Sequence, residues 1–555
     1  MKYGFISVLL ISFFFSTFTM IHSQTTSGDT TNALKDFMSD YQKSFAALMN
    51  SANYATWDAY TKGGDEAFDA AAEANIELSK FHSDSQKFSR LKELLENAKN
   101  ITSIEKRAAE KALLSFEQNQ LPVELLEKMT KQSSAIEQIF QNFRATLDGK
   151  QYSNNELLDM IQKETDSDKR RKIWEALKQV GEAVAPSLIE LAKVRNEAAK
   201  KLGYDNYWLM QVHFQEHSPQ VLLAIFDELD KTGRPLFAAM KNEMDDELKT
   251  KFGVDKIMPW HYDNPFFQQA PPSKEIDPSV FYADKTRDDI VAFSVKYYND
   301  IGLPVEGVLE KSDLFEREGK SQHAFCFDLN ASGDVRILCN IKPTDEWMDT
   351  QLHELGHAVY SVNNDMTLPH NLRDAAHIFT TEGVAMFFGA KARTPDWMIN
   401  YAKVDPIKAN DAADALKKQR RKEQLIFSRW TFVMLHFEKS LYENPDADLN
   451  KLWWDIVEKY QMMPRPENRD KADWASKPHF VNAPVYYHNY QLGELFAAQL
   501  RKSLGATANE NTPKLGEILK TKVFHPCASL EWEEFVKQST GEPLSAKPFV
   551  DELND

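Results

Sequence analysis

The chain has 555 residues, of which 42% are hydrophobic and 12% aromatic; this is ample material for a large buried core, and it excludes a chain that stays disordered. The net charge of −17 at pH 7 argues against nucleic acid as a partner, because phosphate binding needs a basic surface. With only Cys326, Cys339 and Cys527 present, disulfides cannot be the main support of the fold.

Residues 1–23 have the pattern of a signal peptide. Lys2 precedes an apolar run over residues 5–18, and Ser23 supplies a small residue just before a plausible cleavage point. The run is shorter than the roughly 20 apolar residues of a membrane-spanning helix, so we expect no lasting membrane anchor. The sequence therefore predicts a secreted or periplasmic protein whose mature chain begins near Gln24.

Helical patterns fill the first half of the chain. From about residue 34 to residue 252, amphipathic segments rich in Ala, Glu, Lys and Leu follow one another with few glycines. Residues 257–278 then break the pattern with five prolines and no helical period, which predicts a long ordered loop. Helical periodicity resumes over residues 284–301.

A β-structure is predicted at one place, residues 324–341, where the sequence alternates around Gly333 and carries β-branched residues. This pattern indicates one short hairpin. If Ser332 and Gly333 form a two-residue turn, Cys326 lies directly opposite Cys339, close enough for a disulfide.

Helical patterns return from residue 345 and continue to the C-terminus, apart from a charged, proline-rich loop over residues 462–478. No internal repeat and no low-complexity linker divides the chain. We therefore predict that residues 24–555 form a single, mostly α catalytic domain rather than several domains.

The motif His353-Glu354-Leu355-Gly356-His357 has the spacing of a metal site. Two histidines four residues apart on a helix lie on the same face, one turn apart, and can bind one ion. The preceding segment, residues 343–346, contains Thr and two acidic residues and is typical of a helix start. The two histidines should therefore lie in the middle of a helix.

A catalytic zinc needs three protein ligands and one open position for water. Glu382 is the preferred third ligand, because it is a carboxylate within an apolar segment, residues 374–392, that is predicted to be helical. His370 and His377 are alternatives. Glu354 would lie beside the metal rather than on it, placed as the base that takes a proton from the attacking water.

These residues resemble the angiotensin-converting enzyme family of peptidyl-dipeptidases, in a bacterial form. The resemblance rests on the metal motif, on Glu382 placed 25 residues after His357, and on Lys477-Pro478-His479 followed by Tyr487 and Tyr490. Further matches span nearly the whole mature chain: Trp57 with Tyr60-Thr61, Trp174 with Val180-Gly181, Arg195-Asn196-Glu197-Ala198-Ala199 with Gly203-Tyr204, His323-Ala324 with Asp334-Val335-Arg336-Ile337, and Trp453-Trp454 with Lys459-Tyr460-Gln461.

The resemblance implies a mostly helical, two-lobed ellipsoid around a deep central substrate groove, with zinc at its floor and N-terminal helices as a lid. It implies an enzyme that releases dipeptides from oligopeptides with a free C-terminus. The implied zinc ligands are His353, His357 and Glu382. Glu354 would be base and then acid, Tyr490 would stabilise the oxyanion, and His479 would donate a hydrogen bond to substrate carbonyls.

Four positions match substrate-binding groups of the family. His323 and Ala324 correspond to the edge strand that pairs with the substrate backbone. Lys477 and Tyr487 correspond to the groups that hold the C-terminal carboxylate of the substrate. One residue is inserted between His479 and the tyrosines, so Tyr486 is a rival to Tyr487.

The chain also departs from the family pattern. The glutamine of the family's carboxylate pocket has no clear counterpart near residues 258–262, which leaves open the release of a single residue, with His261 as a possible reason. Val457 and Asn489 replace two arginines, so chloride activation is not expected. The family's bridge cysteines correspond to Gln322 and Asn340, so a disulfide here would be shifted inward.

Three alternatives stand beside the peptidyl-dipeptidase. An oligopeptidase of the thimet type shares the metal arrangement but cuts inside peptides, and the segment with Lys477 and His479 disfavours it. A carboxypeptidase would release one residue instead of two. A binding protein without activity would keep the groove, but Glu354 argues against it, because binding needs no base beside the metal.

Overall fold

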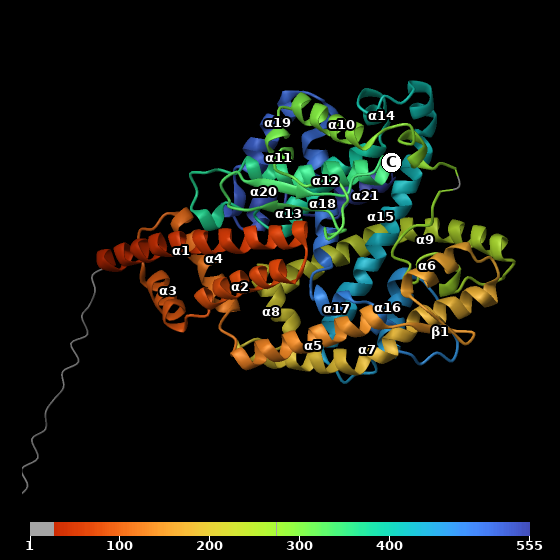
Figure 1. Cartoon of the computed structure of the whole chain (residues 1–555), viewed down its shortest axis with the longest axis horizontal. Helices are drawn as coiled ribbons and strands as arrows, with labels where there is room; N and C mark the ends of the chain where they lie inside the picture. Colours follow the sequence, from red (N-terminus) through yellow and green to blue (C-terminus); the bar gives the residue numbers. More distant parts are fainter. Residues whose placement is uncertain (1–26, 274, 555) are drawn as a thin grey trace, which may run out of the picture.

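The computed structural model describes residues 27–273 and 275–554, so the predicted signal peptide lies outside the described residues. The described chain is mostly helical, as predicted, with helices α1 to α21 and two small antiparallel sheets of two strands each (Figure 1). Among the described helices, none combines the length and the apolar character that crossing a membrane would require.

The first half contains nine helices and a hairpin. Its elements are α1 (Ser27–Lys62), α2 (Asp65–His82), α3 (Ser85–Asn97), α4 (Ser103–Gln118), α5 (Val123–Asn142), β1 (Ala145–Leu147), β2 (Lys150–Tyr152), α6 (Asn154–Lys163), α7 (Ser167–Lys201), α8 (Tyr207–Phe214) and α9 (Pro219–Phe252). The prediction of a single hairpin in the chain is therefore wrong. The β1–β2 turn is made by Asp148 and Gly149, whose backbone φ angles are 48° and 79°, the conformation that favours an Asp-Gly pair in two-residue hairpin turns.

In the predicted loop after residue 252, the regular elements of the described residues are two short 3-10 turns, η1 (Pro259–His261) and η2 (Pro278–Phe281). The second half then follows as α10 (Arg287–Asp300), α11 (Glu306–Leu309), β3 (Phe325–Asp328), β4 (Val335–Leu338), α12 (Asp345–Val362), η3 (His370–Leu372), α13 (Ile378–Gly389), η4 (Ala390–Arg393), α14 (Pro395–Asn400), α15 (Pro406–Glu443), α16 (Leu449–Gln461), η5 (Asp473–Ser476), α17 (His479–Asn482), α18 (His488–Leu504), η6 (Gly505–Asn509), α19 (Pro513–Leu519), η7 (Lys520–Phe524), η8 (Cys527–Ser529), α20 (Trp532–Thr540) and α21 (Lys547–Asn554).

The β3–β4 hairpin confirms the predicted strands but not the predicted disulfide. Cys326 pairs with Ile337 rather than with Cys339, and all three cysteines of the chain are free thiols. The turn is longer than two residues, because the side chains of Asp328 and Asn330 accept backbone N–H groups within the loop and stabilise it. This longer loop shifts the register, so the bridge that a two-residue turn would have allowed does not form.

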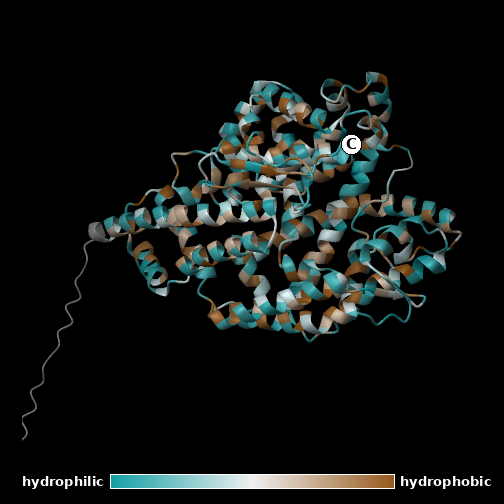
Figure 2. Ribbon diagram, viewed as in Figure 1, coloured by the Kyte–Doolittle hydropathy of each residue, from teal (hydrophilic) through white to brown (hydrophobic). Residues whose placement is uncertain are grey.

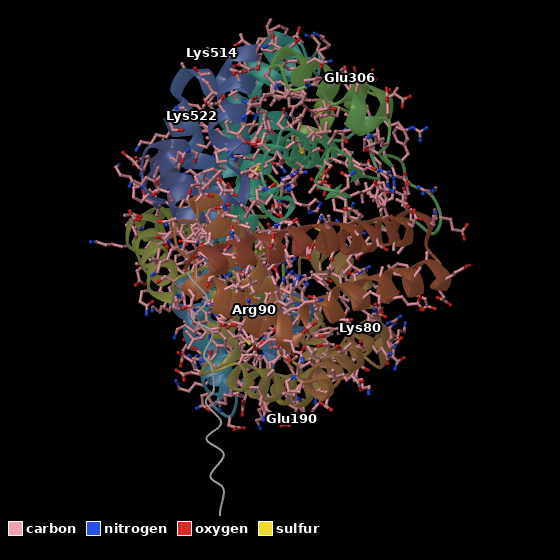
Figure 3. The ribbon with its side chains drawn as sticks, turned by 90° about the vertical axis from the view of Figure 1, so that its left-hand side faces the viewer. Lys80, Arg90, Glu190, Glu306, Lys514 and Lys522 are labelled. Atoms are coloured by element: carbon pink, nitrogen blue, oxygen red, sulfur yellow. The ribbon has the colours of Figure 1, made fainter. Side chains whose placement is uncertain are left out.

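Most helices show both hydrophilic and hydrophobic residues along their length (Figure 2), and their apolar faces meet in one large core that extends over both halves of the chain. Trp174, Trp208 and Trp430 are among its fully buried side chains. Helix α15 ties the halves together, since it packs against α7 and α16 and also against α14 and α18. Charged residues such as Lys80 and Arg90 lie on the outer surface (Figure 3).

Helices α1, α3 and α4 have a hydrophobic cluster of their own, built around Leu34, Tyr41 and Phe116. Helix α1 also reaches the β3–β4 hairpin, where Trp57 packs against Leu329. The N-terminal helices thus form a layer that is packed separately from the main core but is attached to the hairpin.

Candidate active site

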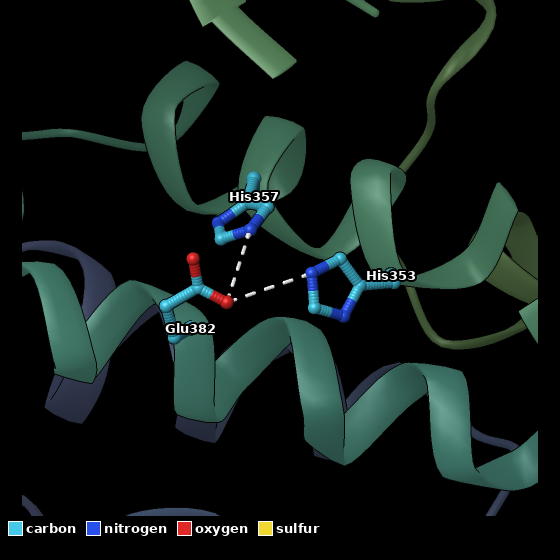
Figure 4. Close-up of side chains that lie close together, drawn as sticks. All are labelled: His353, His357 and Glu382. Carbon is cyan, nitrogen blue, oxygen red and sulfur yellow. Dashed lines mark ion pairs between the residues drawn. The ribbon is translucent and has the colours of Figure 1, made fainter. Parts of the chain in front are cut away.

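His353 and His357 project from α12 toward Glu382 on α13 (Figure 4). The Nε2 atoms of the two histidines lie 3.6 Å and 4.0 Å from Oε2 of Glu382, and the three possible ligand atoms all lie within 4.8 Å of one another. Two ligands of a tetrahedral zinc, each about 2.1 Å from the ion, stand roughly 3.4 Å apart. The cluster is therefore of the right size for zinc.

The chemistry of the three groups fits the same ion. Burial lowers the pKa of His353 to about 4 and that of His357 well below its usual value, so both imidazoles are neutral, the form that binds metals. The hydroxyl of Thr381 lies 2.7 Å from Nδ1 of His357 and orients its ring. Burial raises the pKa of Glu382 to about 7. A bound cation would lower this pKa again, because positive charge favours the carboxylate.

The two alternative ligands are occupied elsewhere. His370 places Nε2 3.1 Å from the carbonyl oxygen of Asn330. His377 caps the N-terminus of α13, and its Nε2 lies 2.8 Å from the carbonyl oxygen of Gln215. The only cluster of three potential ligands found in residues 27–273 and 275–554 is His353, His357 and Glu382.

Glycines allow the helices of the site to approach closely. A β-carbon on Gly356 would lie 2.8 Å from Cα of Ala385, and one on Gly383 would lie 2.8 Å from the carbonyl oxygen of Gly493. Both distances are shorter than van der Waals contact, so α12, α13 and α18 reach this spacing only because these residues lack side chains. This contact brings Glu382 next to the histidines.

Glu354 is 7% exposed and lies in the same cavity as the three candidate ligands. Burial, and then the neighbouring charge of Glu382, raise the pKa of Glu354 to about 8. A divalent cation at the three ligands would lower it again, because positive charge favours the carboxylate. The residue then meets the requirements of a base for an attacking water.

The catalytic cavity has a volume of about 750 Å³. Its walls come from α1, through Phe45, Met49 and Asn53, from strand β3, and from α12, α13 and Tyr490. Ala324, just before β3, lines the cavity, whereas the predicted substrate residue His323 is exposed and does not. Among the described strands, β3 pairs with β4 alone, so its other edge has no strand partner, and its residues Phe325 to Asp328 line the cavity.

The remaining predicted residues form a continuous group next to the metal site. The ring of Tyr487 lies 5.4 Å from that of Tyr490 and 5.1 Å from that of His479. Burial and the charge of Lys477 lower the pKa of His479 to about 4, and its Nδ1 has no hydrogen-bond partner among the described residues. Lys477 places Nζ 5.6 Å from the ring centre of Tyr487, whereas Tyr486 packs on Tyr490.

Lys477 is 5% exposed. In the described part of the chain, no carboxylate lies within 4.0 Å of its ammonium group, which instead stands over the rings of Phe266 and Trp430 at 5.4 Å and 5.1 Å. Its hydrogen-bond acceptor is Oε1 of Gln268, at 2.7 Å. Burial lowers the pKa of Lys477 to about 8.

Gln268 was missed at the level of sequence. The resemblance points to residues 258–262 for the family's glutamine, but His261 there is buried, lies 2.8 Å from the hydroxyl of Ser167 and has a structural role. Gln268 follows a few residues later in the same loop. The available signal was a pair of adjacent glutamines, Gln268 and Gln269, in a segment otherwise rich in aromatic residues and proline.

A helix with the His-Glu-x-x-His motif and a glutamate on the following helix is the gluzincin arrangement, and with this fold it defines a zinc metallopeptidase, a hydrolase of peptide bonds. Residues 28–262 match the family described as Angiotensin-converting enzyme, and residues 307–555 match Peptidase family M3. The two matches lie in different parts of the chain, each less than half of it, and show that the chain is similar to both families.

Individual relatives are distant. The chain is 24% identical to Carboxypeptidase 1 of Bacillus subtilis (strain 168) over 274 residues, which are 43% of this chain and 53% of the relative. It is 22% identical to the angiotensin-converting enzyme of Oryctolagus cuniculus over 573 residues, 93% of this chain and 42% of the relative. For the angiotensin-converting enzyme of Haematobia irritans exigua the identity is 24% over 218 residues, 38% of this chain and 35% of the relative. The chain thus spans about half of the first relative and less of the other two.

Proposed function

We propose that this protein is a peptidyl-dipeptidase, which removes dipeptides from the free C-terminus of oligopeptides. The observation that carries the proposal is Lys477, a buried ammonium group with no carboxylate within 4.0 Å in residues 27–273 and 275–554. A buried charge without an ionic partner is costly. The C-terminal carboxylate of a peptide would supply that partner.

The surroundings of Lys477 suit a carboxylate. Gln268 accepts a hydrogen bond from Lys477 through Oε1, which leaves its amide N–H groups as donors for the same carboxylate. Tyr487 adds a phenol on the other side. In a site screened from water by aromatic rings, a charge-assisted contact of this kind fixes the end of the peptide, and so the bond that is cut.

The proposed roles at the reacting bond are those that the resemblance implies, and the positions of the side chains support them. When bound by His353, His357 and Glu382, zinc would polarise the carbonyl group and acidify water. Glu354 would take the proton from the attacking water and then pass it to the leaving amine. Tyr490 would donate a hydrogen bond to the oxyanion, and the neutral imidazole of His479 would donate one to a substrate carbonyl.

We also propose that the substrate binds in a central groove between two lobes. The catalytic cavity and a second cavity of about 970 Å³ are lined by the neighbours Tyr490 and Gln491, respectively. A peptide would lie along both, with its backbone paired to the free edge of β3 near Ala324. Helix α1, which forms a wall of the catalytic cavity, would act as a lid.

Two other products are weighed against the dipeptide. Release of one residue is supported by the match to a protein named Carboxypeptidase 1. Internal cleavage would be the activity of the thimet-type alternative, which shares the metal arrangement. The distance between the scissile bond and Lys477 determines whether a dipeptide or a single residue is released. Both of these activities require a free C-terminal carboxylate, whereas internal cleavage does not.

The proposal includes an exported enzyme that acts on oligopeptides outside the cytoplasm. The support is the signal-peptide pattern of residues 1–23. Export can be tested by N-terminal sequencing of the protein from its native host, with a new N-terminus near Gln24 as the expected result.

The activity is tested with one oligopeptide in two forms, free and amidated at the C-terminus, incubated with the zinc-loaded protein. Product masses should show loss of a dipeptide from the free form only. Glu354→Gln is the control for contaminating peptidases. Equal internal cleavage of both forms would establish an oligopeptidase, and loss of a single residue would establish a carboxypeptidase.

A further inference from the structure

The second cavity begins one helical turn from the metal site. Asp349 lies four residues before His353 on α12, and Glu494 lies four residues after Tyr490 on α18. Residues four apart on a helix share a face. The cavity therefore continues directly from the catalytic centre along α12 and α18.

The same cavity opens beside the proposed carboxylate pocket. Gln268 lines it and accepts the hydrogen bond of Lys477. Phe427 also lines it, and its ring lies 6.3 Å from the ring of Tyr487. A peptide whose carboxylate is held at Lys477 would thus place its last side chain at the mouth of this cavity.

The charged residues on the cavity wall are mostly acidic. Six carboxylates and three cations line it: Asp263, Asp345, Glu346, Asp349, Glu423 and Glu494 against Lys163, Arg393 and Arg420. Arg393 is already engaged, with Asp345 at 2.8 Å and Glu423 at 3.4 Å. The lining is therefore short of positive charge.

Two carboxylates of this cavity, Asp349 and Glu494, have no ion-pair partner among the described residues. Asp349 has no hydrogen bond or ion pair within 4.0 Å among the described residues, and Glu494 accepts a hydrogen bond from Gln424 at 3.1 Å. Arg420 is near both carboxylates, but no ion pair within 4.0 Å joins it to either in the described chain. Arg393 is also near Asp349, and Arg501 is also near Glu494, yet neither carboxylate forms an ion pair within 4.0 Å with any described residue.

An unpartnered amide points to a ligand at the same place. Gln491 lines the cavity and is 1% exposed, and neither its amide oxygen nor its amide nitrogen has a hydrogen-bond partner in the described structure. A buried amide group without hydrogen-bond partners destabilises the folded protein. A ligand with several N–H donors would bond the oxygen of Gln491 together with Asp349 and Glu494.

We propose that this cavity receives the side chain of the substrate's C-terminal residue and selects a cationic one, lysine or arginine. The ammonium or guanidinium group would bind Asp349 and Glu494 and donate to Gln491. An acidic side chain would meet two carboxylates, and an apolar one would leave the polar groups unpaired. This inference rests on the proposed function, because it needs the free C-terminus to be held at Lys477.

The test is a peptide series that differs only in the last residue: lysine, arginine, glutamine, norleucine and glutamate. The expected result is a kcat/KM for the lysine and arginine peptides at least ten times that for the norleucine peptide, with glutamate lowest. Similar rates for all five, or a preference for glutamate, would overturn the inference while leaving the proposed function intact. Cleavage of none of them would overturn the proposed function and the inference with it.

Substitutions in the cavity test whether its residues determine the preference for a cationic C-terminal residue. The ratio of lysine to norleucine peptide should fall toward one in Asp349→Asn and in Glu494→Gln. It should rise in Arg420→Met, because the cavity loses a competing cation, and a merely structural role of Arg420 would not raise it. Asp396→Asn is the matched control, since Asp396 is an exposed carboxylate outside the lining. A ratio unchanged by all three cavity variants would overturn the assignment.

Discussion

Lys477 and Gln268 stand 209 positions apart in the chain, yet Nζ of the lysine donates a 2.7 Å hydrogen bond to Oε1 of the glutamine. This hydrogen bond joins the long loop after α9 to the segment before α17. It also places beside Tyr487 a cation that has no ion pair with a carboxylate in the portion of the chain that the structure describes. The ring of Tyr487 meets, edge to face, the ring of Tyr490, the residue proposed to bind the oxyanion.

Removing the charge of Lys477 should weaken recognition of the substrate carboxylate. For Lys477→Met we expect kcat/KM toward a peptide with a free C-terminus to fall about 10- to 100-fold, the range that a charge-assisted hydrogen bond supports. Steady-state kinetics measures the change. Lys471→Met is the matched control, because Lys471 is exposed and pairs with Glu182 on the surface. A loss of equal size in the control would contradict the assignment.

The same lysine predicts an alkaline limit of activity. Burial holds the pKa of Lys477 at about 8, so the charged form is present below this pH and is lost above it. We expect kcat/KM for free peptides to decrease as the pH rises through about 8. Lys477→Arg, which stays charged, should keep its activity to higher pH. An unchanged alkaline limb in this variant would show that another group titrates.

The contact between α13 and α18 should control metal binding. A methyl group at Gly383 would lie 2.7 Å from Cδ1 of Phe496 and 2.8 Å from the carbonyl oxygen of Gly493. We expect Gly383→Ala to cost about 1–3 kcal/mol of stability and to displace Glu382, with zinc affinity at least tenfold lower. Thermal unfolding and competition with a chelator measure both. Gly307→Ala, which has open space around it, should change neither.

Three buried histidines should make the protein sensitive to acid. The ring of His217 lies 4.5 Å from that of His377 and 5.2 Å from that of His488. Burial lowers the pKa of His217 to about 4 and those of the other two well below their usual value. In the unfolded chain the pKa of a histidine is about 6.5, so below this pH the unfolded state binds more protons than the folded state. The free energy of unfolding therefore decreases as the pH falls from about 6.5 toward 4.

For His217 alone, the loss should be about 3 kcal/mol at pH 4. Denaturant unfolding at a series of pH values measures it. His217→Gln should unfold with a smaller dependence on pH over this range. The exposed His213, changed to Gln, serves as the control. If His217→Gln keeps the full dependence, the acid sensitivity resides in other groups.

Chloride should not activate the enzyme. Val457 is buried and apolar, and Asn489 donates a 2.8 Å hydrogen bond to Oε1 of Gln215, so neither position supplies a cation. We expect equal kcat/KM in chloride and in acetate at the same ionic strength. A rise of several-fold in chloride alone would show an anion site elsewhere in the chain.

The local patterns predicted the metal site well, because a helix face is determined by spacing over a few residues. His353 and His357 needed only the helix period, and Glu382 was recognisable as a carboxylate in an apolar segment. Gln268 could not be assigned, because only the tertiary path of a long loop brings it to Lys477. The hairpin register was missed for a local reason, since Asp328 stabilises a longer turn than the Ser-Gly pair suggested.

Because α1, α3 and α4 share a hydrophobic cluster of their own, the wall that α1 contributes to the catalytic cavity can detach without exposing the main core. The free-energy cost of such a local opening is set by contacts to the hairpin, such as the 3.2 Å hydrogen bond from Asn53 to the carbonyl oxygen of Asp328, and by contacts to the η3 region, where Gln42 is hydrogen-bonded to Asn371. Amide hydrogen exchange should therefore be faster in α1 than in α12 and α13. Access of peptides would be governed by this partial unfolding, with the zinc ligands kept rigid throughout.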